Sequence, residues 1–197
     1  MRKNYQTKGI FCLEGSWDND LQKPSTIRPI LELLRMNYKI DYIYRDCATK
    51  EELEFYLKKW TQTKYDAYPI LYLASHGEEF SICLGQHDCN LDDLAGVLQG
   101  KCQNRIIIFA SCSTFDTDKR HLKRFLQQTE ALAILGYKND VDWLKSTAFE
   151  LLMLSEIQEN EFSGRGIDAI KDRLIELAKQ FREIDFRLLL SKEVAIE

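Results

Sequence analysis

Two apolar segments of the sequence each end in a side chain that can do covalent chemistry. Residues 71–77 read Leu-Tyr-Leu-Ala-Ser-His-Gly, and residues 106–112 read Ile-Ile-Ile-Phe-Ala-Ser-Cys. A buried parallel strand presents the residues after its carboxyl end at the edge of the sheet, where open α/β folds place their chemistry. If the two strands are neighbours, about 4.8 Å apart, His76 and Cys112 face one site. The pair is then a candidate dyad of base and nucleophile.

The chemistry of this pair follows from the two side-chain types. A free cysteine has a pKa near 8.5, so only a few per cent of it is thiolate at neutral pH. Histidine is the one side chain whose ordinary pKa lets it take up a proton and return it near pH 7. We therefore expect His76 to assist attack by Cys112 on a carbonyl carbon, or to protonate the leaving amine.

The composition narrows the class of protein. The chain has 197 residues, is 45% hydrophobic and contains 3 Pro and 9 Gly, which predicts one compact core. A net charge of -4 argues against a nucleic-acid partner. No apolar run approaches the roughly 20 residues of a membrane span, and the N-terminus does not read as a signal peptide, so we expect a cytoplasmic protein without a membrane partner. One domain is expected over residues 1–190, followed by a loose tail over 191–197.

The six cysteines predict free thiols in a reducing compartment rather than three disulfides. Cys12, Cys83 and Cys112 lie in or directly after apolar, strand-like runs, where cysteine is commonly a small buried hydrophobe. Cys83, His87 and Cys89 have the spacing C-x3-H-x-C, but they supply only three ligands and straddle a predicted hairpin tip. We therefore expect no metal and no other cofactor.

Strand and helix patterns alternate along the chain. Apolar runs predict strands at residues 9–13, 40–44, 69–75, 80–84, 105–110 and 131–135. Helical periodicity predicts helices at residues 24–38, 51–60, 91–98, 118–128, 141–158 and 167–182. Thr49 and Asn90 are predicted caps of the second and third helices, while Gly136 is expected to end the last strand. Residues 85–88 are predicted to form a turn and residues 163–166 a hinge. This order predicts an α/β fold, with a mainly parallel central sheet and helices on both faces.

Four segments together resemble the caspase-like fold, and within it the CHAT group of bacterial cysteine peptidases. His76-Gly77 closes a strand, and residues 80–84 and 90–94 resemble the small hairpin and the "L-x-D-L" helix of that group. Residues 110–114 are similar to the nucleophile turn, usually S-A-C-x-T-G, and residues 133–142 with 146–148 are similar to the strand and acidic turn after it. The resemblance covers about residues 68–177. Phe115 stands where the group often has glycine, so we expect a turn of different shape.

The resemblance implies a three-layer fold and a cysteine endopeptidase with Cys112 and His76 as its catalytic dyad. It places the backbone N–H groups of Gly77 and Cys112 around the oxyanion, where one such donor is worth about 3 kcal/mol. The implied substrate is a protein or peptide. A separate regulatory protein is also expected, by analogy with the group.

Three acidic residues are candidates for binding a lysine or arginine side chain of the substrate, as in many relatives that cleave after basic residues. Glu14 follows the first predicted strand, and Asp140 and Asp142 follow the fifth. The alternative for Asp140 and Asp142 is capping of the next helix, and for Glu14 it is a solvated loop.

Two other functions remain open at this point. One is a catalytically weak or inactive caspase-like module that acts through protein–protein interaction, which Phe115 favours. The other is a nucleotide-binding or flavodoxin-like regulator. The loop over residues 14–20 argues against a bound nucleotide. It contains only one glycine, and its several acidic residues would repel a phosphate.

Overall fold

The computed structural model describes residues 7–20, 22–23, 25–85 and 87–194. Its centre is a six-stranded sheet in the order β2-β1-β3-β7-β8-β9. The strands are β1 (Ile10–Glu14), β2 (Tyr42–Asp46), β3 (Ile70–Ala74), β7 (Ile106–Ala110), β8 (Ala133–Tyr137) and β9 (Phe186–Leu190). The first five in this order run parallel, and β9 is antiparallel to β8. The predicted mainly parallel sheet is confirmed.

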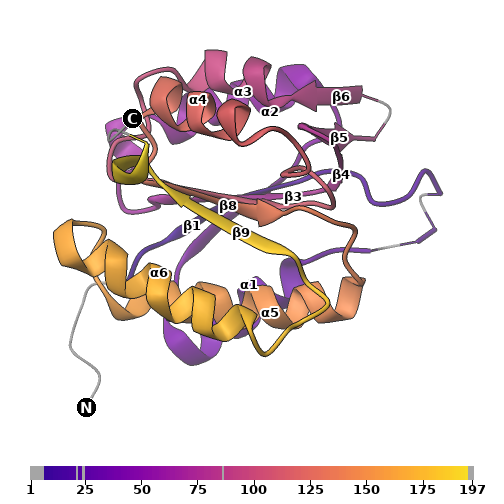
Figure 1. Cartoon of the computed structure of the whole chain (residues 1–197). Coiled ribbons are helices and arrows are strands. Elements are labelled where there is room, and N and C mark those ends of the chain that lie inside the picture. The colour runs from indigo at the N-terminus through magenta and orange to yellow at the C-terminus, as the bar shows by residue number, and fades with distance from the viewer. Residues whose placement is uncertain (1–6, 21, 24, 86, 195–197) are drawn as a thin grey trace.

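Helices cover both faces of this sheet and complete three layers (Figure 1). On one face pack α1 (Arg28–Tyr38), α5 (Trp143–Glu156) and α6 (Gly164–Ala178). On the other face pack α2 (Lys50–Trp60), α3 (Leu91–Leu98) and α4 (Lys119–Thr129). Because both faces are covered, every residue of β1, β3, β7 and β8 is buried, as expected for the continuous apolar runs that encode them.

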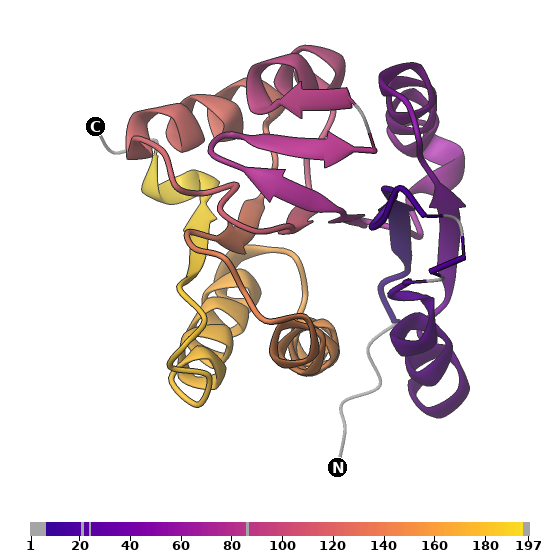
Figure 2. The same cartoon turned by 90° about the vertical axis from the view of Figure 1, so that its right-hand side faces the viewer.

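A small antiparallel sheet lies at the carboxyl end of the central strands. It contains β4 (His76–Glu78), β5 (Ser81–Leu84) and β6 (His87–Asn90). Figure 2 shows it toward the viewer, beside the loop that follows β1. The turn predicted over residues 85–88 is shorter in the structure: Gly85 lies in a turn, whereas His87 and Asp88 already pair with β5. Gln86 lies outside the described residues. The small sheet and α3 together form the crossover from β3 to β7.

Two predicted helix caps are confirmed. Thr49 and Glu52 form a reciprocal capping box at the start of α2. Asn90 caps α3 by accepting a hydrogen bond from the N–H of Asp93 at 2.8 Å. Short polar side chains of this kind satisfy backbone donors that a helix start leaves open, which is why their spacing could be read from the sequence.

Several expected boundaries differ in the structure. β8 runs through Gly136, which therefore does not end it, and α6 begins at Gly164 inside the expected hinge. α1 begins only at Arg28, and β9 was not predicted. The expected tail starts with a 3₁₀ helix, η3 (Ser191–Glu193), and Val194 is buried; residues 195–197 lie outside the described part. Two further 3₁₀ helices are η1 (Thr63–Tyr65) and η2 (Ile157–Glu159).

Three findings concern membrane spans, cysteines and metal ligands. In the part of the chain that the structure describes, no helix combines the length and apolar character needed to cross a membrane. All six cysteines are free thiols. No group of three or more potential metal ligands comes together among the described residues.

Candidate functional site

His76 and Cys112 lie at the same end of two neighbouring parallel strands. β3 pairs with β7 in a register that sets Ala74 opposite Ala110, and each candidate residue follows two positions later. Both side chains line one pocket of about 180 Å³. The expected juxtaposition of the two residues at one edge of the sheet is therefore observed.

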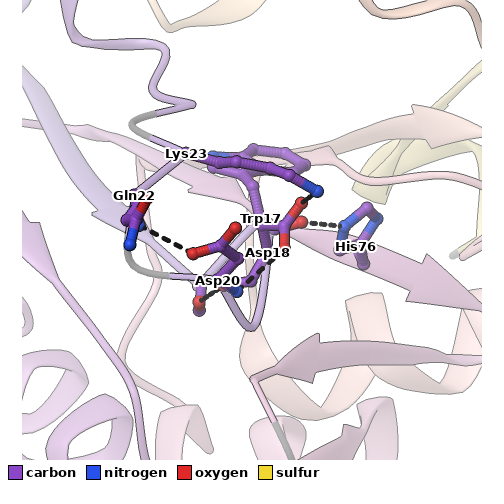
Figure 3. Close-up of polar contacts among 7 residues, drawn as sticks. Trp17, Asp18, Asp20, Gln22, Lys23 and His76 are labelled. Atoms are coloured by element: carbon purple, nitrogen blue, oxygen red, sulfur yellow. Dashed lines mark hydrogen bonds and ion pairs between the residues drawn. The ribbon is translucent and has the colours of Figure 1, made fainter.

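The imidazole of His76 is held by the loop after β1. Its Nε2 lies 2.7 Å from the carbonyl oxygen of Trp17 (Figure 3). A carbonyl oxygen only accepts hydrogen bonds, so Nε2 must carry the proton, and in the neutral ring this leaves Nδ1 as the proton acceptor. The indole of Trp17 also packs edge-on against the imidazole, with ring centroids 5.3 Å apart. Trp17 thus fixes both the position and the tautomer of His76.

Cys112 differs from the other cysteines in what faces its sulfur. It is half-buried, and the backbone N–H of Val141 donates to its Sγ at 3.5 Å. A donor directed at sulfur stabilises negative charge there. Burial raises the pKa of the other five thiols: to about 12 for Cys47, Cys83 and Cys102, to about 11 for Cys89, and well above its ordinary value for Cys12. These five thiols are therefore held neutral.

The turn that carries Cys112 is fixed by hydrogen bonds on both sides. Ser113 has a positive φ of 52°, which is uncommon for a residue with a side chain and is typical of functional sites. Its hydroxyl donates to Asp140 at 2.8 Å, and its N–H donates to the carbonyl oxygen of Asn139 at 3.1 Å. Behind it, the buried Thr114 donates to the carbonyl oxygen of Ser81 at 3.1 Å. The surroundings thus hold the strained turn in place.

Gly77 packs directly against this turn. A Cβ at this position would collide with the carbonyl oxygen of Cys112 and would stand 2.5 Å from Oγ1 of Thr114. The resemblance implied that the backbone of Gly77 lies close to the oxyanion of a substrate. The structure shows that the close approach is to the nucleophile turn itself. The role of the Gly77 N–H at an oxyanion stays a prediction.

Phe115 anchors the same turn in the core. It is 2% exposed, its ring centroid lies 5.7 Å from that of Phe109, and its N–H donates to the carbonyl oxygen of Tyr137 at 2.9 Å. Its ring covers Gly136, where a Cβ would stand 2.8 Å from a ring carbon. The turn therefore takes its positive φ at Ser113, and the aromatic residue points away from the pocket into the core.

Glu14 has a structural role in place of the expected contact with substrate. It is 2% exposed, so the alternative of a solvated loop is wrong. Its carboxylate accepts hydrogen bonds from the hydroxyls of Tyr44 and Thr26, the indole of Trp17 and the N–H of Ile27, at 2.5 to 2.7 Å. Four donors leave no open position for a substrate cation. Glu14 instead fixes the loop that presents the Trp17 carbonyl to His76.

Asp140 and Asp142 are exposed and do not line the pocket of Cys112. Asp142 is the N-cap of α5 and accepts a hydrogen bond from the N–H of Lys145 at 3.0 Å, which confirms the capping interpretation. Asp140 supports the turn through Ser113. The three acidic candidates are therefore not brought together at one site.

The pocket contains a different carboxylate, that of Glu150 on α5. It is 4% exposed and accepts hydrogen bonds from the hydroxyls of Tyr72 and Tyr137. Desolvation raises its pKa to about 7, although the two hydroxyls act in the opposite direction. Glu150 was not among the site residues expected from the sequence. The available signal was a glutamate on the helix face that also carries the buried Ser146, Phe149 and Met153.

Comparison with known proteins adds one match. Residues 7–190 match the family model described as a family of unknown function, DUF6642. No curated protein matches the chain.

Proposed function

We propose that this chain, which belongs to the DUF6642 family, is a cysteine peptidase of the caspase-like and CHAT type that uses Cys112 and His76 as its catalytic dyad. One observation carries the proposal. A histidine whose Nε2 is fixed by a backbone carbonyl and a half-buried cysteine line the same pocket at the ends of adjacent parallel strands. Nucleophile, base and a group that orients the base are the parts that covalent catalysis requires.

The proposed reaction uses the two side chains in turn. Nδ1 of His76 takes the thiol proton while Sγ of Cys112 attacks the carbonyl carbon of the scissile peptide. The tetrahedral intermediate collapses, the C–N bond breaks, and the leaving amine takes the proton from His76. Water, deprotonated by His76, then hydrolyses the thioester and frees Cys112. The N–H groups of Gly77 and Cys112 are the proposed donors to the oxyanion.

Trp17 and Val141 are proposed positioning residues in this scheme. The Trp17 carbonyl keeps the proton on Nε2, so that Nδ1 is free to act as a base, and the Val141 N–H supports charge on Sγ. Both contacts come from backbone atoms. Substitution of either side chain therefore leaves the hydrogen-bonding group in place, which is why side-chain patterns gave no sign of these contacts.

The loop after β1 is poorly suited to a bound nucleotide. Asp18 accepts a hydrogen bond from the N–H of Asp20, and Asp20 accepts one from the N–H of Gln22 (Figure 3). Lys23 pairs with Asp18 at 3.0 Å. Carboxylates thus occupy backbone donors that a phosphate would need. This arrangement favours the peptidase over the nucleotide-binding alternative.

Cleavage of a complex peptide mixture tests the proposal. The protein is incubated with a chymotryptic digest of whole-cell protein, which keeps internal lysine and arginine residues, and new peptide termini are identified by mass spectrometry. We expect new termini with the wild-type protein and none with Cys112→Ala. Equal termini from both proteins, or none from either, would contradict the proposal and favour the interaction module.

A further inference from the structure

One buried carboxylate, that of Glu150, lines the pocket shared by Cys112 and His76. Among the described residues that line it, Glu150 is the only acidic one, and none is a lysine or arginine. The described partners of its carboxylate are the hydroxyls of Tyr72 and Tyr137, which are neutral donors. A buried charge of this kind is expensive unless a cation compensates it. When Glu150 is ionised, it is therefore a negative site to which the described residues of the pocket supply no lysine or arginine as a partner.

The walls of the pocket suit a cation that carries an apolar stem. Trp17 and Trp143 both line it and meet edge to face, with ring centroids 4.5 Å apart. Indole faces attract ammonium and guanidinium groups, and the rings also give apolar surface to a hydrocarbon chain. Trp143 is 42% exposed, so this wall reaches solvent at the mouth.

The size of the pocket limits what can enter. Its volume of about 180 Å³ is comparable to the ~150 Å³ cavity that holds one benzene molecule, and it is smaller than the ~300 Å³ of ordinary small-molecule sites. One extended side chain fits such a volume, whereas a nucleotide or a large cofactor does not.

We infer that this pocket receives the lysine or arginine side chain of the residue before the scissile bond, with Glu150 as its counter-charge and Trp17 and Trp143 as its walls. The inference rests on the proposed function, because it uses Cys112 to define where the substrate lies. It assigns the recognition of a basic residue to Glu150, and not to Glu14, Asp140 or Asp142. The raised pKa of Glu150 agrees with a buried carboxylate that has no cation beside it among the described residues. A bound cation would lower this pKa.

Protection of Cys112 from alkylation tests this assignment with two isosteric probes. Butylguanidinium mimics the end of arginine, and butylurea has the same shape without charge. Each is titrated while the rate of Cys112 alkylation by iodoacetamide is measured by peptide mass mapping. In the wild-type protein we expect butylguanidinium to protect with an apparent dissociation constant about tenfold or more below that of butylurea.

The variants identify the group responsible. Glu150→Gln should bring the ratio of the two dissociation constants close to one. Glu156→Gln, the same change on the same helix at an ion pair with Arg173, should leave the ratio unchanged. Trp143→Leu is a second variant at an exposed position that keeps an apolar wall and removes the indole; the ratio should fall by about two- to fivefold. If Glu150→Gln does not fold, Trp143→Leu tests the cation pocket in its place.

The outcomes separate this inference from the proposed function. A ratio near one in the wild-type protein, or an unchanged ratio in Glu150→Gln, overturns the cation pocket. The dyad is judged by a different quantity, the dependence of the unprotected alkylation rate on His76. A protein can therefore fail one test and pass the other.

Discussion

The carbonyl oxygen of Trp17 accepts a hydrogen bond from Nε2 of His76 at 2.7 Å, across 59 positions of the sequence. Glu14 supports this contact, because its carboxylate accepts hydrogen bonds from the indole of Trp17 and from the N–H of Ile27, near the two ends of the same loop. The base is thus oriented by a loop that a buried carboxylate organises.

Removal of that carboxylate should affect both stability and reactivity. In Glu14→Ala the donors of Trp17, Thr26, Ile27 and Tyr44 lose their common acceptor, and we expect the free energy of unfolding to fall by about 3 kcal/mol. The alkylation rate of Cys112 should fall as well, since the loop no longer fixes His76. Urea unfolding and iodoacetamide labelling measure the two effects. Glu156→Ala, at an exposed ion pair, is the control, and an equal effect there would refute the role of Glu14.

Phe115 and Gly136 should be coupled in stability. Because a Cβ at Gly136 would stand 2.8 Å from the Phe115 ring, Gly136→Ala should destabilise the protein by about 1–3 kcal/mol. Phe115→Ala should cost about 3–5 kcal/mol. In the double variant the added methyl group enters the space that the ring has left. The loss in free energy of unfolding should therefore be smaller than the sum of the losses in the two single variants. Additive values in a urea-unfolding cycle would show that the ring does not cover Gly136.

Glu150 predicts that stability depends on pH. Burial raises its pKa from 4.5 to about 7, so the folded state binds more protons than the unfolded state between these values. The free energy of unfolding therefore falls as pH rises through this window, by about 3 kcal/mol in total from this group. The buried groups that face it, Tyr72, Tyr137 and Cys12, have pKa values raised by burial and stay neutral there.

The measurement is a comparison of Glu150→Gln with the wild-type protein at pH 5 and pH 8. The amide does not ionise, so the variant should gain stability relative to the wild type as pH rises. Urea unfolding at both values gives the difference. The same difference at pH 5 and pH 8 would mean that Glu150 does not change its protonation in this range.

The sequence predicted the elements whose signals are local. Continuous apolar runs marked β1, β3 and β7, and the side chains of Thr49 and Asn90 marked helix starts, because each depends on residues close in sequence. The pairing of His76 with Cys112 followed from the same runs. β9 has the same length as the other strands of the central sheet, but it was missed because it is not a continuous buried run: only Leu189 and Leu190 at its end are buried.

The rest of the site depends on contacts between distant segments. The backbone groups of Trp17 and Val141 have no side-chain pattern. Glu14 was expected to bind substrate or to lie in a solvated loop, because its burial by four donors depends on the folded loop. Gly136 was expected to end β8. In the structure β8 continues through it, and glycine is needed there because the ring of Phe115, from the turn after β7, packs against it. Of these residues, only Glu150 could have been found from the sequence, because it is an acidic residue on the helix face that is otherwise mainly apolar and buried.

The alkylation rate of Cys112 tests the central claim most directly. Limited iodoacetamide treatment near pH 7, followed by peptide mass mapping, gives a rate for each of the six thiols. Cys112 should react fastest, and His76→Ala should slow it by about tenfold or more, because the base that takes its proton is gone. His121→Ala, on the exposed face of α4, should change nothing. A Cys112 that reacts no faster than Cys47 or Cys102, or that ignores the loss of His76, would contradict the peptidase dyad.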